Sequence, residues 1–263
     1  ALMCLAEALL RVPDEETADK LIAEKISTGK WAEHLGNSDH WLVNAGTWGL
    51  MLTGRVVNLP EEMKGEGGEV LAKVVKRLGE PVVRAGAMQA MRILGEQFVL
   101  GRNIDAALKR GAGMVRSGLA TRYSFDMLGE GARTNEDAER YLVSYARAID
   151  AVGEASEGKG PHASSGISVK LSALHPRYES RLEEKVFAEL YPRILQLAES
   201  AKKWNIGLTF DAEEADRLVL SLKLFERVAL EPSLKGWEGL GLAIQAYQKR
   251  TRPLIERLTS LAR

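Results

Sequence analysis

The sequence predicts an α/β protein in which a purely helical segment, residues 1–118, precedes a parallel β-sheet covered by helices, residues 119–263. Two observations support this division. Up to about residue 118, apolar residues recur only at helical spacing. Beyond residue 123, short apolar runs alternate four times with amphipathic stretches, which is the pattern of consecutive βα units. Since parallel strands need long crossover connections, this alternation predicts a parallel sheet.

The first segment is predicted to be a series of amphipathic helices. Leu2, Leu5 and Leu9 fall on one helical face, and residues 17–26 repeat that spacing. Further helices are predicted over residues 41–52 after Asp39, residues 82–98 after Pro81, and residues 104–117 after Asn103. Asp and Asn are favoured N-caps and Pro is favoured in a first helical turn, so each of these helices has a suitable start.

The second segment is predicted to hold four strands, each followed by a helix. The strands are expected over residues 123–128, 167–171, 206–210 and 239–244. The helices are expected over residues 135–155, 182–203, 215–229 and 253–262. Two arrangements of such units remain open. A doubly wound nucleotide-binding sheet needs a glycine-rich loop after its first strand, where DMLGEGART offers only Gly129 and Gly131. A barrel instead collects its chemistry at the carboxyl ends of many strands.

A polar side chain lies at or just after the end of each predicted strand, namely Glu130, Lys170, Asp211 and Gln245. Because the carboxyl ends of parallel strands meet at one edge of a sheet, we expect these side chains to form a site there. Lys170 gives the strongest indication. A lysine between Val169 and Leu171 must pair with a carboxylate, bind an anion or lose its proton on burial, and each outcome is typical of functional sites.

The other three residues also have structural explanations. Acidic side chains such as Glu130 and Asp211 are favoured near the first turn of the next helix. The primary amide of Gln245 suits the edge of a flat heterocycle, but it suits a hydrogen bond at the rim of the sheet equally well. For these positions the residue type alone does not decide between a site and a cap.

The composition is that of an ordinary globular protein. Hydrophobic residues make up 45% of the chain, and 36 Lys and Arg residues balance 36 Asp and Glu residues. Without a net positive field to attract phosphates, we expect no nucleic-acid binding through this chain. The longest uncharged apolar run, residues 41–54, is too short to span a bilayer. Cys4 is the only cysteine, which excludes an internal disulfide and favours the cytoplasm. The chain starts at Ala1 inside a helical pattern, so we expect it to be cut from a longer protein.

The four histidines indicate neither a metal site nor a general base. They show no metal-ligand spacing among themselves or with Cys4, so we predict no metal. His175 precedes Pro176 in a loop, where a solvent-facing or backbone-bonded ring is expected rather than a catalytic one. Tyr123 and Tyr145 fall at strand or helix spacing, which predicts core packing.

Four stretches together, YSFDMLGE, ISVKLSALHPRY, TFDAEEADR and GLAIQAYQKR, resemble the proline dehydrogenase domain of the bacterial bifunctional flavoenzyme called proline utilization A. The resemblance covers essentially the whole chain. It implies that residues 1–118 are the helical segment before the catalytic barrel, and that residues 119–263 are the first half of a (βα)8 TIM-like barrel, truncated after the fourth unit. It also implies noncovalent FAD and the oxidation of L-proline to Δ1-pyrroline-5-carboxylate by hydride transfer to flavin N5.

The resemblance assigns a role to each strand-end residue. Lys170 matches the lysine that helps to hold the proline carboxylate, and Asp211 matches the aspartate beside that lysine. Glu130 matches an acidic loop residue that forms an ion-pair gate over the substrate, and Gln245 matches a glutamine that hydrogen-bonds the flavin ring. Further family contacts, including a Tyr-x-x-Arg-Arg motif, lie beyond Arg263, so we expect the isolated chain to be inactive and to bind no stoichiometric FAD.

The resemblance also implies partners and a location. They are L-proline, a quinone or another electron acceptor, and a fused or separate aldehyde dehydrogenase module, in the cytoplasm with peripheral association at the inner membrane. Two alternatives stay open. Lys170 could form a Schiff base in an aldolase-like barrel with Asp211 as its acid/base partner, or the chain could be a non-catalytic assembly segment.

Overall fold

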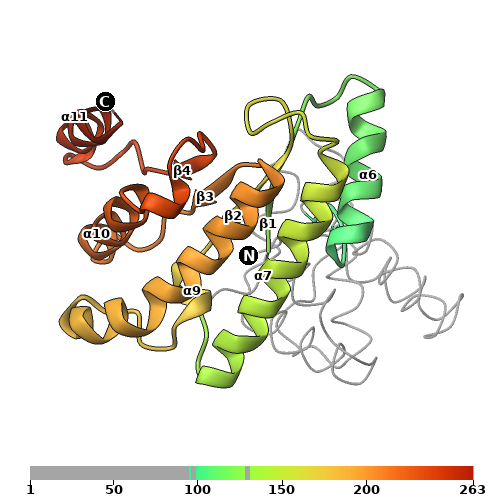
Figure 1. Cartoon of the computed structure of the whole chain (residues 1–263). Coiled ribbons are helices and arrows are strands. Elements are labelled where there is room, and N and C mark those ends of the chain that lie inside the picture. Colours follow the sequence, from blue (N-terminus) through green and yellow to red (C-terminus); the bar gives the residue numbers. More distant parts are fainter. Residues whose placement is uncertain (1–94, 96–98, 128–130, 263) are drawn as a thin grey trace, which may run out of the picture. The chain divides into compact units, whose positions relative to one another are not determined.

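The structure, a computed structural model, describes residue 95, residues 99–127 and residues 131–262 (Figure 1). The chain divides into two compact units, Ala1–Arg102 and Asn103–Arg263, and almost all described residues belong to the second. Apart from Gly95, the helices predicted before residue 99 lie outside the described residues. The helix predicted after Asn103 is confirmed as α6, Ile104–Arg116. Asn103 caps its start, since Asn103 Oδ1 accepts a hydrogen bond from the Ala106 N–H at 2.9 Å. The domain boundary at residue 118 stays a prediction.

The four predicted βα units are confirmed. The strands are β1 (Ser124–Asp126), β2 (Gly166–Val169), β3 (Leu208–Phe210) and β4 (Leu240–Leu242). The long helices that follow them are α7 (Asn135–Ala155), α9 (Glu183–Trp204), α10 (Leu218–Ala229) and α11 (Thr251–Leu261). The strands are shorter than predicted. In particular, β2 ends at Val169 and the chain enters a short helix, α8 (Leu171–Leu174), directly after Lys170.

The strands form one parallel sheet in the order β1-β2-β3-β4. Crossovers between parallel strands are right-handed, so a sheet that grows in one direction places its helices on the same face. The helices follow this rule, since α7 packs against α9 and α9 against α10, as Figure 1 shows. A doubly wound sheet would reverse its direction of growth. The winding is therefore that of a barrel, which decides between the two arrangements that the sequence left open.

The two faces of the sheet differ in polarity. Phe125, Ile167, Val169, Leu208 and Phe210 are buried, and alternation along each strand directs them toward the covering helices. The opposite face carries a row of small or polar residues, in which Asp126 pairs with Ser168, Ser168 with Thr209, and Thr209 with Gly241. On this face Ser124 Oγ and Ser168 Oγ lie 2.7 Å apart, which confirms that the two side chains point the same way. The hydrophobic core therefore lies between the sheet and the helices.

Local signals fix the ends of the two longest helices. Thr134 and Asp137 form a capping box at the start of α7, with each side chain accepting the other's backbone N–H. Asn205 ends α9 in the left-handed conformation, with φ of 52°. The two helices approach closely at Gly153, where an added Cβ would lie 2.2 Å from Trp204 Cγ. This contact explains the glycine inside α7.

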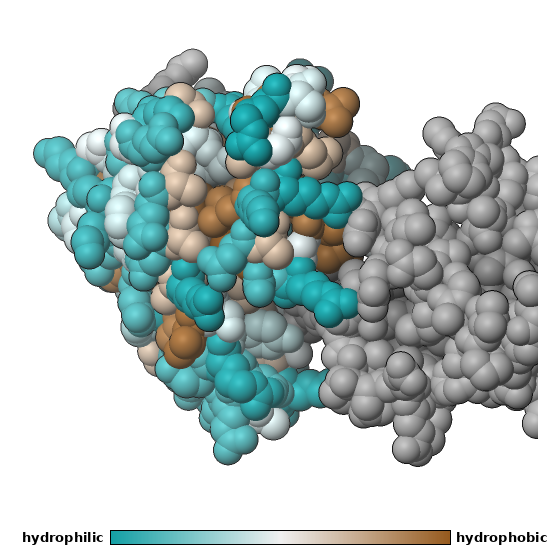
Figure 2. All heavy atoms as spheres, turned by 90° about the vertical axis from the view of Figure 1, so that its right-hand side faces the viewer, coloured by the Kyte–Doolittle hydropathy of each residue, from teal (hydrophilic) through white to brown (hydrophobic). Residues whose placement is uncertain are grey.

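Among the residues that the structure describes, apolar side chains at the surface are few and dispersed. Figure 2 shows one side of the molecule, on which hydrophilic residues predominate over the described part. Exposed apolar residues such as Leu119, Leu230 and Tyr247 lie in separate connecting segments, after α6, α10 and β4 respectively. Single exposed apolar residues are normal in folded proteins, and they do not indicate a docking surface. Within the described ranges, the helices are also too short or too polar to cross a lipid bilayer.

Candidate functional site

Lys170 lies at the carboxyl end of β2 with only 8% of its surface exposed. Its Nζ lies 2.8 Å from Asp211 Oδ2, directly after β3, and 2.5 Å from Asp126 Oδ2, at the end of β1. The structure thus brings Lys170 and Asp211 together, as their positions at neighbouring strand ends predict. It also adds a second carboxylate, that of Asp126.

The electrostatic surroundings keep Lys170 charged. Burial by itself lowers the pKa of an ammonium group, because a low-dielectric environment disfavours the charged form. Hydrogen bonds and charge attraction from Asp126 and Asp211 act in the opposite direction and prevail, so the pKa of Lys170 is raised above its usual value. Lys170 is therefore a fixed ammonium at neutral pH. The described part of this cluster holds more negative than positive charge.

The backbone of Lys170 is held as well. Its N–H donates to the hydroxyl of Tyr145, from α7, at 3.2 Å. Tyr145 is fully buried, which confirms the predicted core packing, but the hydrogen bond to Lys170 was not predicted. The helical spacing of Tyr145 in the sequence predicts that its ring faces the core. The partner of its hydroxyl depends on how α7 packs against β2, which the sequence does not show.

Asp126 is a site residue that the sequence reasoning missed. The first strand was predicted to run to residue 128, which places Asp126 inside the strand and leaves Glu130 as its polar end. The strand in fact ends at Asp126. An acidic residue inside an otherwise apolar run, as in YSFDML, was the available signal. Glu130 lies outside the described residues, so its predicted gating role stays a prediction.

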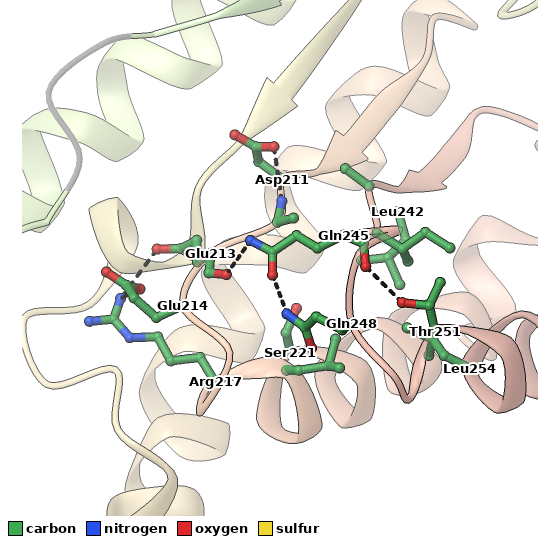
Figure 3. A pocket seen from close by; sticks show the side chains of 14 residues that line it. Asp211, Glu213, Glu214, Arg217, Ser221, Leu242, Gln245, Gln248, Thr251 and Leu254 are labelled. Atoms are coloured by element: carbon green, nitrogen blue, oxygen red, sulfur yellow. Dashed lines mark hydrogen bonds and ion pairs between the residues drawn. The ribbon is translucent and has the colours of Figure 1, made fainter.

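Gln245, after β4, is fixed by several hydrogen bonds (Figure 3). Its Nε2 donates to the Glu213 carbonyl oxygen at 3.0 Å, and its Oε1 accepts from Gln248 Nε2. Its own carbonyl oxygen accepts from Thr251 Oγ1 at 2.7 Å. The amide plane of Gln245 is therefore set by the protein. Whether it also contacts a flavin stays a prediction.

Glu213 connects α8, which follows β2, with the segments that follow β3 and β4. Its Oε1 accepts a hydrogen bond from the Ser172 N–H at 3.1 Å, and its Oε2 lies 3.2 Å from Arg217. Through its carbonyl oxygen it also holds Gln245. These contacts depend on tertiary structure, and no pattern in the sequence pointed to them.

An open cleft of ≈ 540 Å³ lies at the carboxyl ends of β2, β3 and β4. Its lining residues are Gly131, Lys170, Ser172, Ala212, Glu213, Glu214, Ala215, Arg217, Gln245 and Tyr247. Two of the four residues predicted from strand ends, Lys170 and Gln245, thus line one cavity. Asp211 lines a separate, smaller pocket next to it and reaches the cleft through its contact with Lys170.

His175 is a buried structural residue. Its Nδ1 accepts a hydrogen bond from the Arg177 N–H at 3.1 Å, and its Nε2 lies 3.0 Å from Glu189 Oε2. A ring whose Nδ1 accepts from the backbone carries its proton on Nε2, so Nε2 donates to the carboxylate. The predicted backbone-bonded ring is confirmed. In the described part of the chain, no group of three or more His, Cys, Asp or Glu side chains is placed to hold a metal ion.

Comparisons with known proteins agree over both parts of the chain. Residues 107–263 match the family model for proline dehydrogenase, and residues 1–98 match the model for the DNA-binding domain of proline dehydrogenase. The chain is 51% identical to the bifunctional protein PutA of Salmonella typhimurium and 50% identical to that of Escherichia coli. Each match covers 100% of this chain and 20% of the relative.

Solved structures give the same result. A mutant of Bradyrhizobium japonicum Proline Utilization A is 49% identical, with a TM-score of 0.61 over 99% of this chain and 25% of that one. The protein from Bdellovibrio bacteriovorus, at 17% identity and a TM-score of 0.64 over 98% of this chain and 27% of that one, shares the fold.

The model matched by residues 1–98 is described as DNA-binding, whereas the neutral charge of the chain predicts no nucleic-acid contact. Within these residues, Asp and Glu outnumber Lys and Arg. The absence of nucleic-acid binding through this chain stays a prediction. The chain spans about a fifth of the length of the curated relatives it matches, at 20% of each. By the match over residues 107–263, it belongs to the proline dehydrogenase family.

Proposed function

We propose that the protein containing this chain oxidises L-proline to Δ1-pyrroline-5-carboxylate, with FAD as the hydride acceptor. The observation that carries this proposal is the fixed ammonium of Lys170 in a cleft at the carboxyl ends of parallel strands. This is where barrel enzymes place their chemistry. Membership of the proline dehydrogenase family supports the choice of substrate.

Lys170 would bind the carboxylate of proline. A carboxylate that leaves water for a cleft loses its hydration, and a charge-assisted hydrogen bond, typically worth about 1.5–3 kcal/mol, offsets that loss. Asp211 helps to keep the ammonium charged. The role of this aspartate is therefore to maintain the anchor.

The described residues fit a flavin. The cleft of ≈ 540 Å³ is within the usual range for ligand and cofactor sites, about 300–1,000 Å³. Gln245, held by Glu213 and Gln248, presents an ordered amide at the cleft, which suits the hydrogen-bonding edge of a flat heterocycle. When bound, FAD would supply a hydride acceptor, which no protein side chain offers.

The remaining requirement concerns the substrate amine. The nitrogen of proline must lose its ammonium proton so that its lone pair can assist departure of a hydride from the adjacent carbon. Because Lys170 stays charged well above neutral pH, its titration does not interfere with this step. We therefore propose that turnover rises with pH as the bound amine deprotonates.

The geometry argues against the Schiff-base alternative. A lysine that attacks a carbonyl must be neutral, which requires a lowered pKa. The pKa of Lys170 is instead raised, because the hydrogen bonds and charges of Asp126 and Asp211 outweigh the effect of burial. The same contacts would have to break before Lys170 could react as a nucleophile.

Partners and location belong to the proposal as well. The curated relatives are called bifunctional and are about five times as long as this chain, as the 20% coverage shows, which supports a second module such as an aldehyde dehydrogenase. We propose a quinone or a similar compound as the electron acceptor. The protein would act in the cytoplasm, with peripheral association at the inner membrane.

The visible absorption spectrum of the purified full-length protein tests this proposal. We expect flavin bands that bleach when proline is added without an electron acceptor. In Lys170→Ala the bands should persist at proline concentrations that bleach the unmodified protein. Absence of a flavin spectrum, or a flavin that proline does not reduce, would contradict the proposed function.

A further inference from the structure

We propose that Asp126 and Tyr145 are positioning residues that fix the ammonium of Lys170 in the cleft. The inference rests on the proposed function, because it takes Lys170 as the anchor for a substrate carboxylate. It goes further by assigning a role to two residues that contact Lys170 at opposite ends, one at Nζ and one at the backbone N–H.

Asp126 and Asp211 hold the ammonium from two directions. Asp126 pairs with Ser168 in the sheet, two residues before Lys170, so it lies one row deeper on the polar face. Asp211 lies level with Lys170, because its N–H donates to the carbonyl of Val169 at 2.9 Å. A lysine side chain with one carboxylate partner can pivot about that contact. A second carboxylate below it restricts the ammonium to one place.

Tyr145 fixes the other end of the same residue. The N–H of Lys170 donates to the Tyr145 hydroxyl at 3.2 Å, at the point where β2 gives way to α8. Tyr145 is fully buried in α7, so the hydroxyl cannot move without the helix. The position of Lys170 at the cleft therefore depends on the packing of α7 against the sheet.

A change of charge at position 126 has two opposing consequences. The charged and titratable groups described around Lys170 come from several elements: Asp126 from β1, Asp211 after β3, Glu213, Glu214 and Arg217 in the following segment, Tyr247 after β4, and the hydroxyl of Tyr145 from α7. Removing the Asp126 charge reduces repulsion of an incoming carboxylate, which favours binding. Removing its hydrogen bond releases the ammonium, which disfavours binding. A positioning role requires the second consequence to prevail.

The test uses the full-length protein loaded with its cofactor and cyclopentanecarboxylate as the probe. This ligand keeps the ring and the carboxylate of proline but has no amine, so the pH dependence of its binding reports on the protein. Its dissociation constant is measured by calorimetry from about pH 7 to about pH 10.5. The upper limit is close to the pKa of an ordinary lysine side chain. The proteins compared are unmodified, Asp126→Ala, Asp126→Asn and Tyr145→Phe, with Ser124→Ala as the control.

The variants separate position from charge. Asp126→Ala should bind the probe about tenfold more weakly at pH 7, the loss of one charge-assisted hydrogen bond. Asp126→Asn keeps an acceptor of the same shape and should restore affinity at pH 7. Because it removes an opposite charge, its binding should weaken toward about pH 10.5, where the unmodified protein still binds. Tyr145→Phe should weaken binding about threefold with an unchanged pH profile.

The control and the opposing outcomes are equally specific. Ser124 lies on the same face as Asp126 but bonds to Ser168, so Ser124→Ala should bind like the unmodified protein. If Asp126→Ala and Asp126→Asn both bind the probe as tightly as the unmodified protein or more tightly, the carboxylate only repels and the inference is wrong. If Asp126→Ala does not fold, two other results decide the question. Asp126→Asn must lose affinity at a lower pH than the unmodified protein, and Tyr145→Phe must bind the probe more weakly; an unchanged pH profile together with an unchanged Tyr145→Phe affinity would show that the inference is wrong.

Failure of this inference is distinguishable from failure of the proposed function. Flavin bleaching by proline is measured on the same unmodified preparation. If proline bleaches the flavin but Asp126→Ala and Tyr145→Phe retain full affinity for the probe, the inference alone fails. If proline does not bleach the flavin while the variants bind the probe with the expected affinities, Lys170 is a carboxylate anchor and the proposed reaction is wrong.

Discussion

Replacing Lys170 by Met tests how strongly the buried ammonium is coupled to its surroundings. Methionine keeps an unbranched stem but removes the charge, so Asp126 and Asp211 lose the cation that lies 2.5 and 2.8 Å from them. Breaking a fully buried ion pair costs about 3–5 kcal/mol. Here the two aspartate side chains are 34% and 28% exposed, and water compensates in part. We therefore expect a loss of about 2 kcal/mol in the free energy of unfolding.

Urea denaturation followed by circular dichroism measures this loss, with Lys223→Met as the matched control. Lys223 also pairs with a carboxylate, that of Glu183 at 2.7 Å, but the two side chains are 48% and 41% exposed. Such a surface pair contributes at most about 1 kcal/mol. Equal stabilities of the two Met variants at pH 7 would refute the reasoning.

Three further predictions follow from the same structure. Turnover should rise between about pH 7 and pH 9, because the substrate amine deprotonates in this range. The affinity for proline should not fall over the same range, because the raised pKa of Lys170 keeps its ammonium charged. A bell-shaped dependence of proline affinity on pH would contradict this prediction. Gln245→Ala should weaken FAD retention about tenfold in equilibrium dialysis, and unchanged retention would remove it from the cofactor site. Gly153→Ala should destabilise the protein by about 1–3 kcal/mol through its clash with Trp204, whereas Gly113→Ala, whose added Cβ meets only the end of a flexible side chain, should not.

The sequence predicted the fold through periodicity. The helix over residues 135–155 was predicted from its amphipathic pattern with the ends that α7 has, and the structure shows that a capping box of Thr134 and Asp137 fixes its start. The four strands were found because short apolar runs stand out between amphipathic helices. The winding direction was not predictable from the residues alone. It follows from the strand order, which only tertiary structure shows.

The candidate site was predicted in part, for an equally physical reason. Lys170 and Asp211 were expected to meet because neighbouring parallel strands bring their ends together. Asp126 was missed because the first strand was predicted to end two residues too late, at residue 128. With that end, Glu130 became the polar residue that follows the strand. Tyr145 and Glu213 act through contacts between elements far apart in the sequence, and such contacts leave no periodic signal.

The role of Lys170 as a carboxylate anchor is tested most directly by comparing proline with pyrrolidine, which lacks the carboxylate. The quantity is the ratio of kcat/KM for proline to kcat/KM for pyrrolidine, in the full-length protein and in Lys170→Met. If the ammonium binds the carboxylate, the ratio should fall about 10- to 100-fold in the variant, the equivalent of one charge-assisted hydrogen bond. A ratio that is the same in both proteins would show that Lys170 does not contact the acid group of the substrate.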